Sequence, residues 1–111
     1  MDIKNSPKKY PVTVGVKDFD TAPVLESIKI LLKGDIDYEF RTTVCKELFD
    51  TEDFKEISAI IKGAKNYFLQ AYKDSGDILN GAFTTPSKEE MYIYAKAFSN
   101  TVENLQIRGV G

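Results

Sequence analysis

Two polar side chains, on separate segments rich in aromatic and β-branched residues, are the first candidates for chemistry in this sequence. Arg41 lies in the run of residues 37–44, and Gln70 lies in the run of residues 67–72. Both runs are typical of strands, in which successive side chains point to opposite sides. Each strand then has one apolar side and one partly polar side, which carries Arg41 or Gln70. Such a face either binds a polar ligand or is solvated.

The sequence excludes several kinds of catalytic and metal site within this chain. It contains no histidine and only one cysteine, Cys45. Zinc sites with histidine ligands, Ser–His triads and Cys–His dyads are therefore ruled out, as is an internal disulfide. An iron–sulfur cluster usually needs three or four thiolates, so Cys45 alone cannot hold one. We expect Cys45, just past a strand end, to be a spectator thiol in a reducing, cytoplasmic compartment.

Length and composition describe an ordinary globular domain. The chain has 111 residues, of which 42% are hydrophobic and 29% charged, and its formal net charge is −2. This balance is unlike that of a disordered segment, and its acidic sign is unlike that of a protein that neutralises nucleic-acid phosphates. No apolar run approaches the roughly 18–20 residues that cross a bilayer. We therefore expect neither nucleic acid nor membrane as a partner.

Strand and helix patterns alternate along the chain. The expected strands are a marginal one at residues 1–4, then residues 37–44, 67–72 and 105–108. The expected helices lie between Thr21 and Gly34, between Asp50 and Gly63, and after a capping box at Ser87–Glu90. Residues 5–21 read as a loop with a short extended piece at 12–14, and residues 73–85 as a long loop that is a lid, a partner contact or a plain surface loop.

The resulting order, β-α-β-α-β-α-β, predicts an α/β fold with a mostly parallel sheet of about three to four strands and three helices on one side. The partly polar second face fits either a partial TIM-like barrel with a polar interior or a sheet with one solvated face. About 110 residues cannot close a barrel that typically needs roughly 200–250. Open strand edges invite pairing, so we expect either a homodimer through the sheet edge or a fragment of a longer protein.

Four short segments carry a resemblance to a known family. Residues 1–4 (MDIK), 38–44 (YEFRTTV), 67–70 (YFLQ) and 108–110 (RGV) together resemble radical S-adenosylmethionine (radical SAM) proteins. The resemblance is to the activating proteins of anaerobic ribonucleoside-triphosphate reductase, which are related to pyruvate formate-lyase activating enzyme. It runs along nearly the whole chain but matches only the C-terminal half of the family's barrel. It implies that residues 1–111 are a single half-barrel domain without the N-terminal, cluster-binding half.

The resemblance implies a reaction and partners. Such activases hold a [4Fe-4S] cluster through a CxxxCxxC motif, reductively cleave S-adenosylmethionine and generate a glycyl radical on a partner enzyme. The implied partners are anaerobic ribonucleotide reductase or pyruvate formate-lyase, and an electron donor such as flavodoxin. This sequence has no CxxxCxxC motif. The chain alone is therefore expected to lack cluster-dependent activity.

The resemblance also assigns four cofactor-binding residues. Asp2 and Lys4 match the family's Asp-x-Lys near the methionyl end of S-adenosylmethionine, and the alternative is a solvated terminus. Arg41 matches a strand arginine that reaches the cofactor, and its fork suits a carboxylate or ribose hydroxyls. The alternative for Arg41 is an ion pair with Glu39 or with a neighbouring strand. Gln70 matches a polar position whose amide can bind adenine or ribose.

A second function, of another class, is an alternative to the one that the resemblance implies. The chain could be a stand-alone α/β interaction or regulatory module that self-associates through its open sheet. The residues after Gln70 depart from the family, which often continues with Gln-Phe and then Arg-Pro.

The acid pairs Glu52-Asp53 and Glu89-Glu90 lie in the first turns of the expected helices. Capping and the helix dipole explain these acids without a catalytic role.

Overall fold

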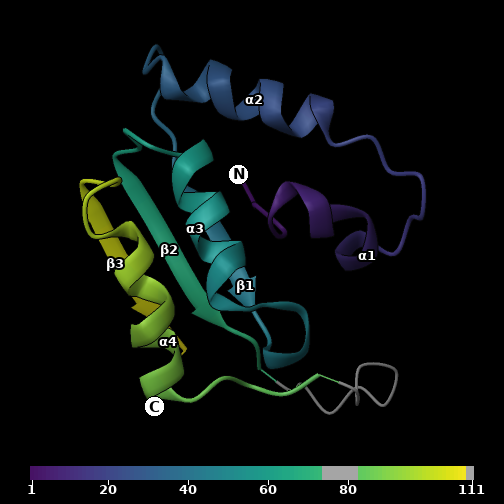
Figure 1. The fold of residues 1–111 in the computed structure, drawn as a ribbon. Helices are drawn as coiled ribbons and strands as arrows, with labels where there is room; N and C mark the ends of the chain where they lie inside the picture. Colours follow the sequence, from purple (N-terminus) through teal and green to yellow (C-terminus); the bar gives the residue numbers. More distant parts are fainter. Residues whose placement is uncertain (74–82, 110–111) are drawn as a thin grey trace.

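The structure, a computed structural model, describes residues 1–73 and 83–109. Its elements in chain order are α1 (Tyr10–Val14), α2 (Ala22–Leu32), β1 (Phe40–Val44), α3 (Thr51–Ile60), β2 (Asn66–Ala71), α4 (Lys88–Ala95) and β3 (Asn104–Arg108). Short 3-10 helices add Pro7–Lys9, Lys46–Leu48 and Lys96–Phe98. The predicted alternation of strands and helices is therefore confirmed from β1 to β3 (Figure 1).

The strands form one open parallel sheet in the order β1-β2-β3 (Figure 1). Asp2 extends this sheet through a single parallel bridge to Arg41. The amide of Ile3 donates to the Arg41 carbonyl at 2.8 Å, and the Arg41 amide donates to the Met1 carbonyl at 3.1 Å. The predicted first strand is thus reduced to one bridge beside β1. The four segments lie in chain order across the sheet, as crossovers of one hand produce.

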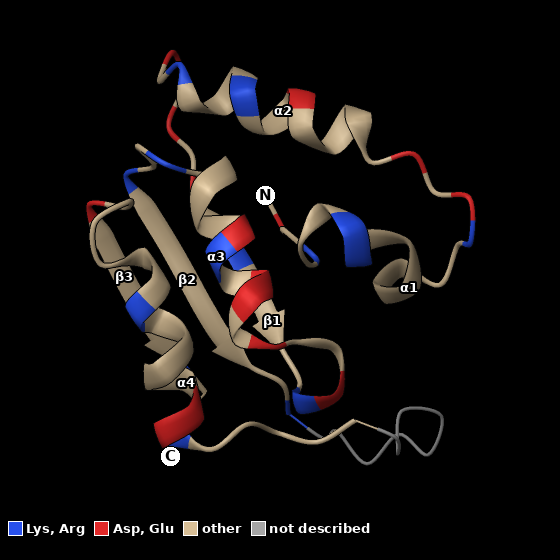
Figure 2. Ribbon diagram, viewed as in Figure 1, with Lys and Arg blue, Asp and Glu red and all other residues tan. Residues whose placement is uncertain are grey.

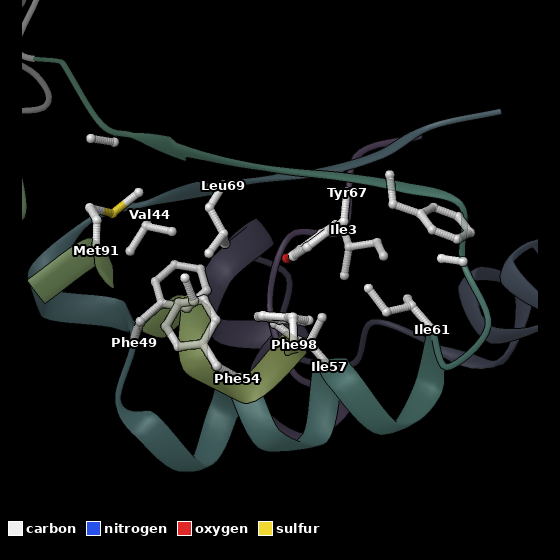
Figure 3. Packing of buried hydrophobic residues seen from close by; sticks show 14 of the residues in the cluster. Ile3, Val44, Phe49, Phe54, Ile57, Ile61, Tyr67, Leu69, Met91 and Phe98 are labelled. Carbon is white, nitrogen blue, oxygen red and sulfur yellow. The ribbon is translucent and has the colours of Figure 1, made fainter. Parts of the chain in front are cut away.

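Helices α3 and α4 cover one face of the sheet (Figures 1 and 3). Burial alternates along β1 and β2 as the sequence pattern predicted. The strand residues under the helices are Phe40, Thr42 and Val44 of β1 and Tyr67, Leu69 and Ala71 of β2, all of them buried. The residues between them are exposed or half-buried. The sheet therefore has one face packed against helices and one face without that layer.

An aromatic cluster joins α3 to α4 and to the sheet. The completely buried ring of Phe54 has its centroid 4.5 Å from that of Tyr94 and 5.1 Å from that of Phe49. Phe98 closes the cluster against Tyr67, with the ring centroids 4.6 Å apart (Figure 3). Removal of these rings from water is the main force that fixes the helical layer on the strands.

Both covering helices begin with a capping box, which the sequence predicted for α4, whereas for α3 it predicted only a capping residue at Asp50 or Thr51. In α3, the Asp53 amide donates to Asp50 Oδ1 at 3.0 Å, and the Asp50 amide donates to Asp53 Oδ2 at 2.9 Å. In α4, the Glu90 amide donates to Ser87 Oγ at 3.1 Å, and the Ser87 amide donates to Glu90 Oε1 at 2.9 Å. The structural explanation of these acids as helix caps is confirmed at Asp53 and Glu90.

The interpretation of residues 12–14 as an extended piece in a loop is wrong. The chain forms a 3-10 helix at Pro7–Lys9 that continues into α1 at Tyr10–Val14. Each helix has a proline in its first two positions, where the fixed φ angle favours a helical start. The Tyr10 ring stacks on Phe19 with centroids 5.6 Å apart. Tertiary packing thus outweighs the strand preference of the β-branched residues.

Two further sequence expectations concern the strand at residues 37–44 and the loop at residues 73–85. The strand predicted for residues 37–44 begins at Phe40, where pairing with β2 begins. Most of the predicted loop at residues 73–85 lies outside the described residues. Among the helices of residues 1–73 and 83–109, none combines the length and apolar character needed to cross a bilayer.

Candidate functional site

The face of the sheet opposite α3 and α4 carries the polar strand residues. In the register, Arg41, Phe68 and Gln106 lie side by side in one row across the strands, and Thr43, Gln70 and Arg108 form the next row toward the carboxyl ends. We call this surface the open face. Paired residues of parallel strands point to the same side of a sheet, so both rows project from this face. The sequence alternation had placed Arg41 and Gln70 on the partly polar side, and the register brings them to the same face.

Three of the predicted residues form one ionic cluster at the edge of the open face. Arg41 Nε donates a hydrogen bond to Asp2 Oδ1, and Lys4 Nζ lies 3.4 Å from Asp2 Oδ2. The Asp2, Lys4 and Arg41 side chains remain 38%, 53% and 56% exposed, so a ligand in solution can reach them. Arg41 thus pairs with a neighbouring segment and not with Glu39. The partner is itself a predicted site residue.

The cluster has the charges to bind a zwitterion. It presents one carboxylate between a guanidinium and an ammonium, and within the described part of the chain the terminal nitrogens of Arg41 have no protein partner. A ligand carboxylate can therefore accept hydrogen bonds from Arg41 and Lys4, while a ligand ammonium can donate to Asp2. An amino acid group carries both charges on one carbon atom. The arrangement is suited to the aminoacyl end of a small molecule.

Gln70 lies on the same face as this cluster, but on the central strand and one row nearer the carboxyl ends. It is half-buried, and the register places it between Thr43 and Arg108. Among residues 1–73 and 83–109 its side-chain amide has no protein hydrogen-bond partner. The amide is therefore available to a ligand that extends across the sheet from the charged cluster.

Sequence reasoning missed the aromatic contact at the centre of the open face. The Arg108 guanidinium carbon lies 3.9 Å from the centroid of the Phe68 ring, a cation–π contact between β3 and β2. The alternation pattern places each residue on the polar side of its own strand. Their contact depends on the register between the two strands, which alternation alone does not define. The pair adds an apolar surface beside Gln70.

A depression of about 540 Å³ lies at the amino ends of the strands, lined by Asp37, Tyr38, Glu39, Asn66 and Phe68. None of the four predicted site residues lines it. The candidate site is therefore the exposed surface of the sheet around Asp2, Arg41 and Gln70.

Cys45 and the wider set of possible ligands do not form a metal centre in the described part of the chain. Cys45 is buried, and burial raises the pKa of its thiol, which favours the unreactive protonated form. Among the described residues there is no group of three Asp, Glu, Cys or His side chains placed to hold a metal. One thiolate does not fit the ligand set of an iron–sulfur cluster.

The Asp2–Arg41 pair predicts a measurable titration. The hydrogen bond from Arg41, with a smaller effect of the nearby Lys4 charge, holds the pKa of Asp2 below its ordinary 3.8. Because the pKa in the folded chain is depressed, the stabilisation is complete above pH 3.8 and is lost as the pH falls through the lower folded value. We expect the Asp2 carboxyl carbon to titrate below 3.8 in a heteronuclear NMR experiment. In Arg41→Gln its midpoint should rise toward 3.8, and an unchanged midpoint would show that no such pair forms.

A comparison with protein-family models, curated proteins and solved structures gave no match to this chain. The geometry above and the resemblance of the four segments are the basis for a functional proposal.

Proposed function

We propose that this chain is the C-terminal, cofactor-binding part of a radical SAM activase that serves a glycyl radical enzyme. The observation that carries the proposal is the cluster of Asp2, Lys4 and Arg41 on the same uncovered face as Gln70. The family resemblance assigns cofactor binding to the same four residues. In this proposal the open parallel sheet is a segment of a TIM-like barrel, and its open face is the inner wall.

In this proposal the four residues bind different groups of S-adenosylmethionine. The two terminal nitrogens of Arg41 and the ammonium of Lys4 bind the methionyl carboxylate, and Asp2 accepts from the methionyl ammonium. Gln70, one strand away, binds the ribose or the adenine edge. Arg41 keeps its Nε bond to Asp2 throughout, which fixes the guanidinium plane for the ligand.

The proposal leaves electron transfer outside this chain. The [4Fe-4S] cluster of such activases supplies the electron that cleaves S-adenosylmethionine, and a chain with Cys45 as its one cysteine does not fit that cluster. This chain binds and orients the cofactor for a glycine of the partner, anaerobic ribonucleotide reductase or pyruvate formate-lyase. An electron donor such as flavodoxin would act on the cluster-bearing part.

Arg41→Gln tests the binding role. We expect its affinity for S-adenosylhomocysteine, measured by isothermal titration calorimetry, to fall about tenfold. A hydrogen bond to a charged group contributes about 1.5–3 kcal/mol, and the exposure of Arg41 places the loss near the lower end. The melting temperature should stay close to that of the wild type, because an exposed ion pair contributes little to stability.

Lys29→Gln is the matched control because it removes the same charge from an exposed position of α2, a helix that carries none of the four predicted site residues. It should bind like the wild type. Equal affinities of the Arg41 and Lys29 variants would contradict the assignment of Arg41. A different result is that the wild type shows no binding of S-adenosylhomocysteine and sediments as a dimer. That result would favour the alternative, an α/β module that self-associates through its open sheet.

A further inference from the structure

The segment that carries Asp2 and Lys4 is anchored at almost every residue. Beyond the two backbone bonds to Arg41, the Lys4 amide donates to the buried Tyr10 hydroxyl at 3.1 Å. The Ser6 amide then donates to Asn5 Oδ1 at 2.7 Å. Asn5 and Ser6 are completely buried, which is unusual for polar residues beside a strand end. Their burial requires hydrogen-bond partners and shows where the segment is held.

Ser6 and the following Lys9 both bind Asp53, in the first turn of α3. Asp53 is completely buried, and its Oδ1 accepts from Ser6 Oγ at 2.7 Å. Its Oδ2 accepts from Lys9 Nζ at 2.6 Å and from the Asp50 amide at 2.9 Å. In Figure 2 the basic turn at Pro7–Lys9 lies alongside α3, which carries acidic residues. One carboxylate thus joins a helix cap to the turn that follows the candidate site.

A second anchor reaches the same segment from another side. Asn5 Nδ2 donates to the Leu48 carbonyl at 2.8 Å and to Thr13 Oγ1 at 3.0 Å, and Thr13 Oγ1 donates to the Lys9 carbonyl at 2.9 Å. The turn is therefore tied to the loop before α3 and to α1 at once. Both carboxylate oxygens of Asp53 and the side-chain amide nitrogen of Asn5 have hydrogen-bond partners. A shift of the Pro7–Lys9 turn would therefore leave buried polar groups unpaired.

We propose that Asp53 is a positioning residue: through Ser6 and Lys9 it holds the 1–4 segment in the register that places Asp2 against Arg41. This inference rests on the proposed function for the identity of the ligand, but not for the positioning itself. Asp53 touches neither Asp2 nor the open face. Its effect on the site passes along residues 3–5. Ile3 lies in the same buried core cluster as Phe54 and Ile57 of α3, and Lys8 Nζ lies 3.7 Å from Glu56 Oε1 of that helix, so Asp53 acts beside these contacts.

The test is hydrogen exchange of the Ile3 amide in the ligand-free chain. The Ile3 amide donates to the Arg41 carbonyl, so its exchange reports opening of the segment. The amide of Leu69, in the central strand, reports global unfolding. In Asp53→Asn we expect Ile3 exchange to rise at least tenfold more than Leu69 exchange rises. Equal changes at both amides would overturn the proposal, because a general loss of stability moves both.

Glu90→Gln is the control with the same pair of structural roles. Glu90 closes the capping box of α4, and its Oε1 lies 3.2 Å from Lys46 Nζ, yet neither bond leads to the 1–4 segment. The ratio of Ile3 to Leu69 exchange should be unchanged in this variant. Ser6→Ala, which keeps the cap and the lysine contact, should raise the ratio about threefold, and this milder change decides the matter if Asp53→Asn does not fold.

Calorimetry with S-adenosylhomocysteine separates this inference from the proposed function. If the wild type binds, Asp53→Asn should bind about tenfold more weakly under conditions where both are folded. Equal binding would overturn the role of Asp53 in the site. If the wild type does not bind, the proposed function fails, and the exchange ratio still decides whether Asp53 holds the segment.

Discussion

Replacement of Phe54 by alanine is expected to lower the free energy of unfolding by about 3–5 kcal/mol. The side chain is completely buried, and its ring lies against Phe49, Tyr94 and Phe98. Alanine removes the transfer free energy of the ring and leaves a cavity whose walls come from three separate elements. Those walls cannot collapse together without moving α4 off the sheet. A small domain has about 5–15 kcal/mol in total, so this one change should bring the chain close to unfolding.

Urea denaturation followed by circular dichroism measures this loss. Tyr92→Ala is the control, because Tyr92 is an aromatic residue of α4 that is 50% exposed and lies outside the cluster. Its effect should be within about 1 kcal/mol of the wild type. A loss below about 1 kcal/mol for Phe54→Ala would show that the aromatic cluster is not the centre of the fold.

Asp53→Ala is expected to have the second largest effect, about 3 kcal/mol. The loss of the Asp53 half of the capping box, the bond that the carboxylate accepts from the Asp50 amide, contributes about 1 kcal/mol. The rest comes from the buried Ser6 hydroxyl and from Lys9, which lose their carboxylate partner. Lys9 is 31% exposed and can turn toward water, which keeps the loss below the upper range for a broken buried pair.

The comparison variant for this prediction is Glu90→Ala at the equivalent position of the other capping box. Glu90 keeps 34% of its side chain exposed, so water can replace its contacts, and its loss should be clearly smaller than that of Asp53→Ala. The same urea experiment compares the two. Equal losses would mean that burial of the Asp53 network adds nothing beyond capping.

The sequence predicted the features of the fold that depend on local pattern. Alternation along β1 and β2 gave the covered and uncovered faces, and the Ser87–Glu90 spacing gave the cap of α4. It failed at residues 12–14, where three β-branched residues in succession indicated extended structure. Pro11 and the stack of Tyr10 on Phe19 make that stretch helical. Packing between distant residues overrides local preference, and it leaves no periodic signal in the sequence.

The candidate site was predictable only in part, for a related reason. Family resemblance selected Asp2, Lys4 and Arg41, and the structure brings these three into one cluster. The contact between Arg108 and Phe68 depends on cross-strand register. The role of Asp53 was recognised as a cap, yet its bond to Ser6 spans 47 residues of sequence. Side-chain contacts across such separations follow from the fold, and the sequence offered no pattern that indicates them.

The packing of helices on one face only has a consequence for how this domain tolerates change. Along β1 and β2, every second side chain is buried against the helices, and the side chains between them do not pack against that layer. In a library of substitutions along either strand, the effect should therefore alternate from residue to residue. Substitution of a buried residue should reduce the amount of folded protein, and substitution of the next residue should leave the fold intact but change ligand recognition. The backbone of either strand can thus acquire a different ligand preference while its fold is conserved.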